Sequence, residues 1–209
     1  GDLDLSGMRD YAKTYGGPGL RELNFHDRAR MLKALALHLK LHRKALYQLS
    51  FETGATLADS KIDIDGGIAT LLVYASKGRR EMPEDFILPD GELELLSRDG
   101  SFLGQHVYTP LRGVAVQINA FNFPVWGMLE KLAPSLLAGV PSVIKPATST
   151  GYVTQAVVRL MLGSGILPRG AIQLIMGGTG NLLDILDCQD TVGFTGSAAT
   201  ALALRARPN

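Results

Sequence analysis

Residues 112–150 constrain the fold of this chain more than any other stretch of its sequence. Mostly β-branched apolar residues from Val114 to Ile118 predict a short buried strand, which stops at Asn119-Ala-Phe-Asn-Phe-Pro. Apolar residues at helical spacing then run from Val125 to Ala138, and Gly139 ends the predicted helix. A second short strand follows at Ser142–Ile144. The stretch is therefore a strand–helix–strand unit, whose strands normally lie parallel and place ligands at their carboxyl ends.

The C-terminal half of the chain continues this alternation. The predicted elements are a helix at Tyr152–Leu162, a strand at Ile172–Ile175, a short helix at Asn181–Leu186, a strand at Thr191–Thr195 and a last helix that opens at Gly196-Ser197 and runs to Asn209. Regular alternation of strand and helix favours a parallel sheet. We therefore expect an α/β fold, a Rossmann-like parallel sheet with flanking helices, over residues 111–209.

The first 92 residues are predicted to be helical. A short helix around Met8 to Tyr15 is expected to end at the breaker cluster Gly16-Gly17-Pro18-Gly19. A long amphipathic helix starts at the N-cap Asn24, and a second one spans Asp59 to Arg80. Gly66-Gly67 interrupts that second helix, and close packing against another backbone explains two glycines there.

The first long helix has an apolar stripe and a basic face. The stripe comprises Met31, Leu32, Leu35, Ala36, Leu39, Leu46 and Leu49, and the basic residues predicted to lie mostly off it are Arg28, Lys33, Lys40, Arg43 and Lys44. A solvated helix surface is the preferred interpretation of the basic face.

Two extended segments separate the helical part from the Rossmann-like part. The Pro-rich and acidic stretch Met82–Gly91 is predicted to be a linker, and Leu93–Leu96 and Phe102–Thr109 are predicted strands. Arg98-Asp99-Gly100 between them is a hairpin signal. These strands lie outside the strand–helix alternation, so residues 93–110 need a partner to cover their edges.

Charge and cysteine content exclude several classes of protein. Lys plus Arg total 21 against 20 Asp plus Glu, so we expect neither nucleic acid nor a membrane as a partner. No apolar run is long enough to span a membrane and the N-terminus lacks a signal-peptide core, which favours a cytoplasmic location. Cys188 is the single cysteine, and His38 and His42, although spaced like a zinc pair, have no acidic third ligand. We therefore expect no metal site.

Glycine-rich turns alone do not define a nucleotide site in this sequence. There is no Walker A motif and no Tyr-x-x-x-Lys pair, and Gly177-Gly178-Thr179-Gly180 does not continue into Gly-x-Gly-x-x-Gly. Thr195-Gly196-Ser197 follows a strand and opens a helix, which exposes backbone N–H groups and a hydroxyl to an anion. An ordinary helix N-cap explains these three residues equally well.

Three motifs together are specific. Asn122-Phe123-Pro124, Lys145-Pro146-Ala147 and Phe194-Thr195-Gly196-Ser197 follow successive strands, and in this order they resemble the aldehyde dehydrogenase superfamily over essentially the whole chain. Further stretches, including Glu52-Thr53-Gly54 and Asp65-Gly66-Gly67, look like the PaaZ-type bifunctional enzymes of phenylacetate degradation. In those enzymes an aldehyde dehydrogenase is fused to a MaoC-like hydratase. The semialdehyde dehydrogenases of benzoyl-CoA catabolism are a similar alternative.

This resemblance implies a role for each matching residue. Asn122 is the implied catalytic residue, which would hold the oxyanion of a thiohemiacetal through its side-chain amide. Lys145 would bind the adenine ribose and its phosphate, and Ser197 with the N–H groups of its helix would meet the pyrophosphate. The implied cofactor-binding set is Ile118, Asn119, Phe121, Lys145, Thr148, Gly180, Thr195, Gly196 and Ser197. The alternatives are a turn asparagine at 122 and a solvated lysine at 145.

One departure from the family pattern concerns the cofactor. Many relatives have a glutamate three residues after the lysine, where this chain has Thr148. A carboxylate there would bind the ribose hydroxyls of NAD and repel the 2′-phosphate of NADP. The resemblance therefore implies a preference for NADP, with NAD possible.

The resemblance also implies what this chain does not contain. The family nucleophile is a cysteine that lies after a segment supplying the general base, and neither occurs in residues 1–209. Cys188 lacks the sequence context of that nucleophile, and we expect it to be a structural thiol. We therefore expect most of a cofactor-binding domain, incomplete and inactive by itself, from an enzyme that oxidises a CoA-linked semialdehyde. The hairpin implies a homo-oligomer through residues 93–109. A non-catalytic nucleotide-binding or structural module is the competing hypothesis.

Overall fold

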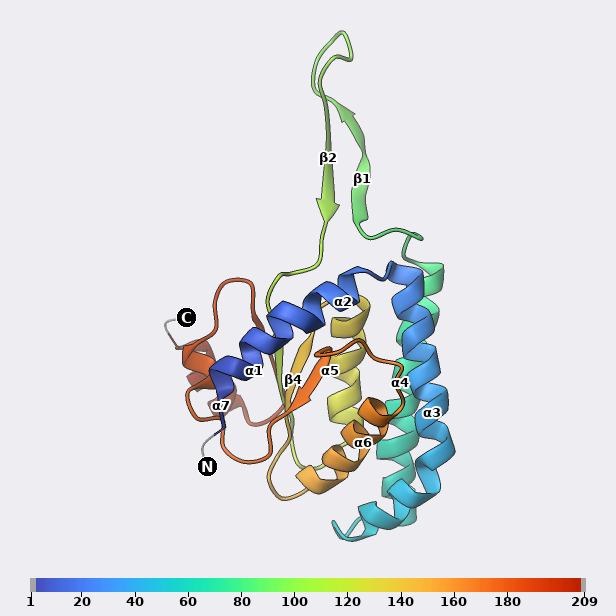
Figure 1. Ribbon diagram of the computed structural model, residues 1–209, viewed down its shortest axis with the longest axis vertical. Helices are drawn as coiled ribbons and strands as arrows, with labels where there is room; N and C mark the ends of the chain where they lie inside the picture. Colours follow the sequence, from blue (N-terminus) through green and yellow to red (C-terminus); the bar gives the residue numbers. More distant parts are fainter. Residues whose placement is uncertain (1–2, 208–209) are drawn as a thin grey trace.

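The computed structural model describes residues 3–207 and contains a four-stranded parallel sheet with helices on both faces (Figure 1). Its strands are β3 (Ala115–Ile118), β4 (Ser142–Lys145), β5 (Ile172–Leu174) and β6 (Thr191–Phe194). They lie in the order β5-β4-β3-β6, and every neighbouring pair is parallel. The predicted α/β fold with a Rossmann-like sheet is therefore confirmed. The strand order reverses between β3 and β6, which is where sheets of this type bind ligands.

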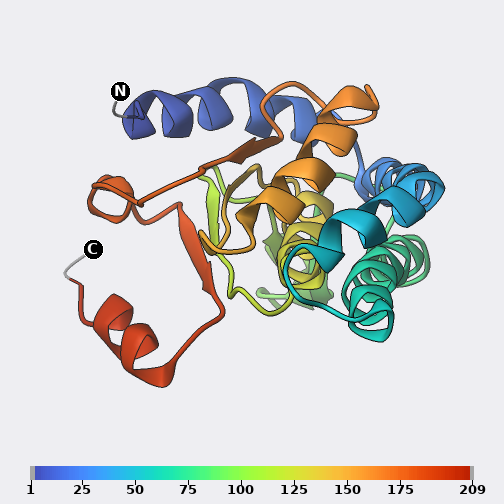
Figure 2. The same cartoon turned by 90° about the horizontal axis from the view of Figure 1, so that it is seen from below.

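Side chains alternate across β4 and divide the interior into two cores. Ile144 belongs to a large core built with helices α3 (Phe25–Phe51), α4 (Leu57–Arg80), α5 (Trp126–Leu137) and α6 (Gly151–Gly163). Val143 and Val116 face a smaller core on the opposite side, together with Leu5 and Ala12 of the N-terminal helices. Figure 2 shows the N-terminal helices on one side of the sheet and the α3–α4 pair beyond α5 and α6 on the other. The sheet is thus covered on both faces, as a parallel sheet requires.

Both long helices begin at capping boxes. The Asn24 side chain accepts the Asp27 N–H while the Asp27 carboxylate accepts the Asn24 N–H, and Thr56 and Asp59 make the same exchange at the start of α4. Gly139 ends α5 with a φ of +79°, as predicted. The capping side chains thus satisfy backbone N–H groups at the helix starts, and Gly139 redirects the chain after α5.

Gly66 and Gly67 allow α4 to pack closely on the start of α5. A Cβ atom on Gly66 would lie 2.7 Å from Cε3 of Trp126, and one on Gly67 would lie 3.0 Å from the Trp126 Cα. The predicted close approach of another backbone is therefore confirmed at Gly67, whereas Gly66 makes room for the Trp126 ring. The predicted interruption of the helix is wrong, because α4 runs through both glycines. Trp126, the single tryptophan, is held at the junction of the two helices.

The N-terminal helix does not end where the sequence predicted. Helix α1 (Leu5–Tyr11) continues through a π-helical turn (Ala12–Gly16) into α2 (Gly17–Arg21), so the prediction of a break at residues 16–19 is wrong. The Gly17 N–H reaches back to the Ala12 carbonyl across this wider turn, and Pro18, which has no N–H, lies in the first turn of α2 where none is needed. A Cβ on Gly16 would lie 2.1 Å from the Gly170 carbonyl oxygen. Gly16 is therefore required for packing.

Arg28 was predicted to lie mostly off the apolar stripe of α3, and this is wrong. The side chain is fully buried, its guanidinium lies 4.6 Å above the centre of the Phe25 ring, and burial lowers its pKa to about 10. A Cβ on Gly139 would lie 2.2 Å from its Nη1. The cation thus lies at the C-terminal end of α5, where the helix dipole favours positive charge.

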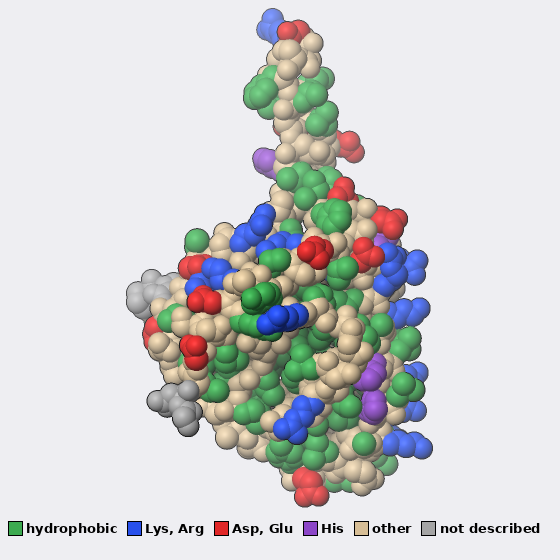
Figure 3. All heavy atoms as spheres, in the orientation of Figure 1, with side chains coloured by type: hydrophobic (Ala, Val, Ile, Leu, Met, Phe, Trp, Pro, Cys, Tyr) green, Lys and Arg blue, Asp and Glu red, His purple; other side chains and the backbone are tan. Residues whose placement is uncertain are grey.

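The two strands that were predicted outside the strand–helix alternation form a projecting antiparallel hairpin. β1 (Leu88–Leu95) starts earlier than predicted and includes part of the expected linker, while β2 (Leu103–Tyr108) matches its prediction closely. In the turn, the Ser97 and Ser101 hydroxyls donate to Asp99, each at 2.7 Å, and Gly100 has a φ of +72°. The hairpin rises from the body with exposed apolar side chains (Figure 3).

The end of the chain differs from its prediction in two elements. Residues Leu182–Asp184 form a 3-10 turn in place of the longer helix expected there. Helix α7 (Ala198–Arg205) ends at Arg205, before the predicted limit at Asn209, and residues 208–209 lie outside the described part. None of the helices within residues 3–207 is long and apolar enough to cross a membrane.

We predict that Gly66→Ala destabilises the chain by about 1–2 kcal/mol, because displacing Trp126 outweighs the roughly 1 kcal/mol of helix propensity that alanine adds. Chemical denaturation followed by Trp126 fluorescence measures this. Gly163→Ala is the matched control, since a Cβ there meets nothing within 4 Å. Equal stability of the two variants would contradict the packing role of Gly66.

Candidate functional site

The carboxyl ends of the strands bring most of the predicted site residues to one edge of the sheet. Ile118 lies level with Lys145 on one neighbouring strand and with Phe194 on the other. The Asn119 N–H continues the ladder to the Lys145 carbonyl at 3.0 Å, and the Thr195 N–H continues it to the Ile118 carbonyl at 3.0 Å. Parallel register therefore places these predicted site residues side by side.

Lys145 is buried and lacks a carboxylate partner. Its ammonium donates to the Pro146 carbonyl at 2.6 Å, only 9% of the residue is exposed, and it makes no ion pair within residues 3–207. Burial lowers the pKa of Lys145. This burial excludes the alternative of a solvated lysine at this position, and a buried cation favours an anionic or hydroxyl ligand.

Asn119 presents a second unsatisfied group at this edge. Only 4% of the residue is exposed, yet neither its side-chain oxygen nor its side-chain nitrogen has a hydrogen-bond partner among the described residues. Thr148, three residues after Lys145, is exposed, and Phe121 is 63% exposed. The edge therefore combines buried, unsatisfied polar groups with an open rim.

The turn at Thr195-Gly196-Ser197 serves as a helix cap. Ser197 Oγ accepts the Thr200 N–H at 3.2 Å at the start of α7. A Cβ on Gly196 would lie 2.4 Å from the Phe194 ring, so only glycine fits under that ring. The N-cap interpretation of Ser197 holds, and the remaining N–H groups of the first turn still point beyond the helix end.

Asn122 lies exposed on the loop between β3 and α5. The loop borders a cavity of about 390 Å³, which is lined on its other sides by the α3–α4 turn, the start of α4 and Thr150. Two threonines fix the loop backbone. Thr150 Oγ1 donates to the Phe121 carbonyl and Thr154 Oγ1 to the Pro124 carbonyl, each at 2.8 Å.

Asp63 is a buried carboxylate that fixes the other end of this loop. Its Oδ1 accepts the Trp126 N–H at 2.7 Å and the Val125 N–H at 3.1 Å, so it caps the N-terminus of α5. Burial raises the pKa of Asp63 to about 6, against the lowering effect of the two N–H donors. Sequence reasoning missed Asp63, Thr150 and Thr154. The signal available for Asp63 was a carboxylate on the stripe that carries Ile64, Gly67, Ile68 and Leu71.

Two residues lie apart from the row of strand ends. They are Gly180, which was predicted to bind the cofactor, and Cys188, which was excluded as the nucleophile. Gly180, at a φ of +47°, lies against Leu5 of α1. Cys188 precedes β6, so it lies toward the opposite edge of the sheet from Asn119 and Thr195. Its side chain is exposed and does not pack in the core, in contrast to an ordinary structural thiol. The neighbouring Asp190 is paired with Arg9 at 2.7 Å.

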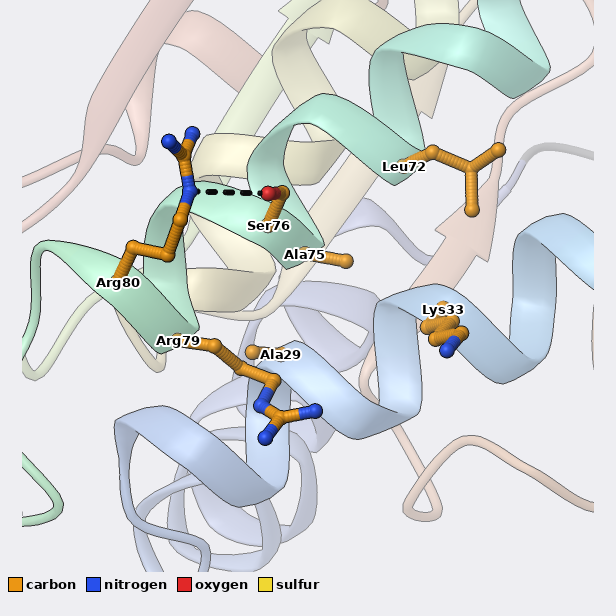
Figure 4. Close-up of a pocket in the computed structure, with 7 residues that line it drawn as sticks. All are labelled: Ala29, Lys33, Leu72, Ala75, Ser76, Arg79 and Arg80. Carbon is orange, nitrogen blue, oxygen red and sulfur yellow. Dashed lines mark hydrogen bonds between the residues drawn. The ribbon is translucent and has the colours of Figure 1, made fainter.

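A separate basic depression lies between α3 and α4. It is lined by Ala29, Lys33, Leu72, Ala75, Ser76, Arg79 and Arg80. Figure 4 shows Arg80 turned away from Lys33 and Arg79 toward Ser76, and the Arg80 Nε donates to Ser76 Oγ at 3.1 Å. Its volume is about 330 Å³. The α4 residues that line it lie toward the end of that helix, whereas Asp63 lies near its start. No group of three or more potential metal-binding side chains occurs among the described residues.

The fold and this edge define a doubly wound α/β domain whose ligand site lies where the strand order reverses. Comparison with known sequences identifies the family, since residues 8–207 match the aldehyde dehydrogenase family. The chain belongs to that family.

The most informative sequence relative is 3,4-dehydroadipyl-CoA semialdehyde dehydrogenase of Aromatoleum evansii. It is 43% identical over 208 residues, which cover 99% of this chain and 40% of the relative. Alpha-ketoglutaric semialdehyde dehydrogenase of Bacillus subtilis is 36% identical over 70% of this chain and 28% of its own length. The chain thus spans well under half the length of these relatives.

Solved structures agree with the fold assignment. Betaine aldehyde dehydrogenase of Staphylococcus aureus, in complex with NAD+, has a TM-score of 0.78 and 27% identity, over 96% of this chain and 38% of that one. A benzaldehyde dehydrogenase of Corynebacterium glutamicum has a TM-score of 0.79 at 22% identity, which supports the fold alone.

The residues present fit a dinucleotide. Within the part of the chain that the structure describes, Lys145 is a buried cation without a counterion, and Asn119 is a buried amide whose donor and acceptor atoms have no partner. Both lie at the reversal of strand order, next to the first turn of α7. Hydroxyl and phosphate oxygens satisfy such groups.

Asp63 makes the stability of the chain depend on pH. Its folded pKa of about 6 lies above that of an unfolded aspartate, so the folded chain binds this proton more tightly. The stabilisation is fully present below pH ~4 and is lost as pH rises through about 6. Two pKa units correspond to at most about 3 kcal/mol.

We therefore predict that wild type loses up to about 3 kcal/mol of unfolding free energy relative to Asp63→Asn between pH ~4 and ~7. Denaturation across this range measures it. Asp59→Asn, one turn earlier on α4, is the control: hydrogen bonds from Thr56 lower the pKa of Asp59, so its contribution changes only below pH ~4 and its curve should run parallel to wild type between pH ~4 and ~7. Parallel curves for wild type and Asp63→Asn would disprove the assignment.

Proposed function

We propose that this chain is the cofactor-binding part of an NADP-preferring dehydrogenase that oxidises an aldehyde to a carboxylic acid. One observation carries the proposal: the sheet edge where strand order reverses holds a buried Lys145 without an ion pair and a buried Asn119 without a side-chain hydrogen bond to any residue of 3–207, next to the loop of Asn122. Membership of the aldehyde dehydrogenase family supports aldehyde oxidation as the reaction.

The residues of this chain would have two tasks in that reaction. Lys145 and Asn119, with the first turn of α7, would hold the ribose and phosphates of the dinucleotide, which accepts a hydride when bound. Asn122 would donate its side-chain N–H to the oxygen of the aldehyde as negative charge develops there. Such a donor typically contributes about 3–4 kcal/mol of transition-state stabilisation.

We propose a CoA-linked semialdehyde as the substrate. The relative from Aromatoleum evansii, whose name specifies such a substrate, supports this class. A PaaZ-type enzyme of phenylacetate catabolism with a MaoC-like hydratase domain is the preferred assignment, and a semialdehyde dehydrogenase of benzoyl-CoA catabolism is the alternative. The basic depression of Lys33, Arg79 and Arg80 offers cations of the kind that bind CoA phosphates.

The cofactor preference is tested by titrating the chain with NADP+ and NAD+. We expect tighter binding of NADP+, because Thr148 places no carboxylate near a 2′-phosphate. Thr148→Glu is expected to weaken NADP+ binding at least about fivefold, since two unit charges near 4 Å repel by about 1 kcal/mol even in water. Thr148→Gln is the neutral control of the same length. Tighter binding of NAD+ by wild type would refute the preference.

The 209-residue chain alone is expected to oxidise no aldehyde. Cys188 is exposed toward the opposite sheet edge from Asn119 and cannot serve as a nucleophile beside Asn122. Formation of NADPH from an aldehyde and NADP+ measures turnover. Activity that persists through purification and disappears in Cys188→Ser would overturn this expectation.

We also propose that the hairpin mediates a homo-oligomer. Leu95 is 71% exposed and Phe102 62% exposed on the two sides of the turn, and apolar strands of this kind need a partner. The double variant Leu95→Asp/Phe102→Asp is expected to shift the protein to monomer in sedimentation velocity. Leu41→Asp, at an 80% exposed position on α3, is the control. The idea fails if both variants sediment like wild type.

A further inference from the structure

The loop that carries Asn122 is fixed by its neighbours and not by Asn122 itself. The Asn122 side chain is exposed and makes no hydrogen bond with any described residue, so the backbone determines where its amide lies. The backbone is attached on both sides of residue 122. Thr150 holds the Phe121 carbonyl before it, and Thr154 holds the Pro124 carbonyl after it.

Asp63 makes the third attachment. It is 4% exposed and comes from α4, a different element from the two threonines of the α6 region. Its Oδ1 accepts both the Val125 and the Trp126 N–H groups, which fixes the exit of the loop and the start of α5. Hydrogen bonds from backbone N–H groups to a carboxylate are among the stronger ones, and this one forms at a helix N-terminus.

We infer that Asp63 is a positioning residue, which acts with Thr154 to place the Asn122 amide for its role at the reacting oxygen. Burying a carboxylate is costly, and no described cation pairs with Asp63 to offset that cost. Among the described residues, the hydrogen-bond donors to Asp63 are the Val125 and Trp126 N–H groups, which follow the Asn122 loop. The catalytic consequence rests on the proposed function, whereas the positioning itself does not.

The surroundings of Asp63 allow a clean test. The described side chains that line the adjacent cavity from α3, the α3–α4 turn, the Asn122 loop and Thr150 are uncharged, and the ionisable one besides Asp63 is Asp59 on α4 itself. Hydrogen bonds with Thr56 keep the pKa of Asp59 low. A change near pH 6 in this region therefore reports on Asp63.

The side-chain amide signals of Asn122 in nitrogen–proton NMR spectra measure the positioning directly, with Asn122→Ala to assign them. Asp63→Leu removes both acceptor oxygens, and Asp63→Asn keeps the one that accepts both N–H groups. Thr154→Val replaces only a hydroxyl by a methyl group. It therefore provides a second test in case Asp63→Leu does not fold. Asp65→Leu is the matched control, because Asp65 accepts the Tyr47 hydroxyl at 2.7 Å and makes no hydrogen bond with the described residues of the loop.

We expect the Asn122 amide signals to shift or broaden in Asp63→Leu and Thr154→Val, to lie in Asp63→Asn near the wild-type positions at low pH, where Asp63 is protonated, and to stay unchanged in Asp65→Leu. In wild type they should also move with a midpoint near pH 6, and this movement should be absent in Asp63→Asn. Unchanged Asn122 signals in Thr154→Val and in folded Asp63→Leu would overturn the inference. If Asp63→Leu does not fold, Thr154→Val and the pH titration decide.

Kinetics of the whole enzyme separate this inference from the proposed function. Thr154→Val and Asp63→Leu should lower kcat by roughly 10- to 100-fold with little change in KM, as displacement of a catalytic group by about 1 Å does. Asp65→Leu should retain wild-type kcat. If the amide signals move while kcat does not, the positioning stands and the role of Asn122 in oxidation fails. If kcat falls without any movement of the signals, the inference fails.

Discussion

The parallel register of β3 with its two neighbours is the constraint on which the rest of the structure depends. It sets Ile118 level with Lys145 and with Phe194, so each loop that follows these residues starts at the same edge. A slip of one residue would turn every side chain of a strand to the opposite face. Val143 and Ile144 would then exchange cores, which makes such a slip costly. Packing of the two cores thus determines which polar groups meet at the edge.

The helices transmit this constraint to the loop of Asn122. Close packing at Gly66 and Gly67 brings α4 against the start of α5, and this places Asp63 within hydrogen-bond distance of the Trp126 N–H. Thr154 reaches the Pro124 carbonyl from α6, on the same side of the sheet. An apolar core and a small set of buried hydrogen bonds therefore position the side chain of Asn122, which makes no hydrogen bond of its own with the described residues. Sites supported in this way keep their geometry without substrate.

Much of the fold could be predicted because its signals are local. Alternation of short β-branched runs with helical stripes predicted the parallel sheet, and capping residues such as Asn24 predicted where helices begin. The errors have non-local causes. The sequence around Gly16 predicts a helix break, but the helix continues there. A glycine is needed at this position because a Cβ atom would collide with the Gly170 carbonyl. Arg28 reads as a surface cation, but it lies on the buried stripe beside the end of α5.

In the candidate site, too, the residues that local signals mark were predicted, and those that depend on non-local contacts were missed. Lys145 and Asn122 were predicted because they follow strands in a recognisable motif, and Ser197 was predicted both as a ligand and as a cap. Its capping bond to Thr200 is now evident. Asp63 was missed because its partners, the N–H groups of residues 125 and 126, are more than sixty positions away in sequence. No local pattern reports a carboxylate whose function is to cap another helix.

A crystal structure of the chain with NADP+ tests the central claim most directly. The account predicts the dinucleotide at the carboxyl edge between β3 and β6, with its ribose oxygens at Lys145 and Asn119 and its phosphates at the first turn of α7. The loop of Asn122 should keep its hydrogen bonds to Thr154 and Asp63. A dinucleotide bound instead in the basic depression between α3 and α4, or at the edge near Cys188, would contradict the assignment of the sheet edge as the cofactor site.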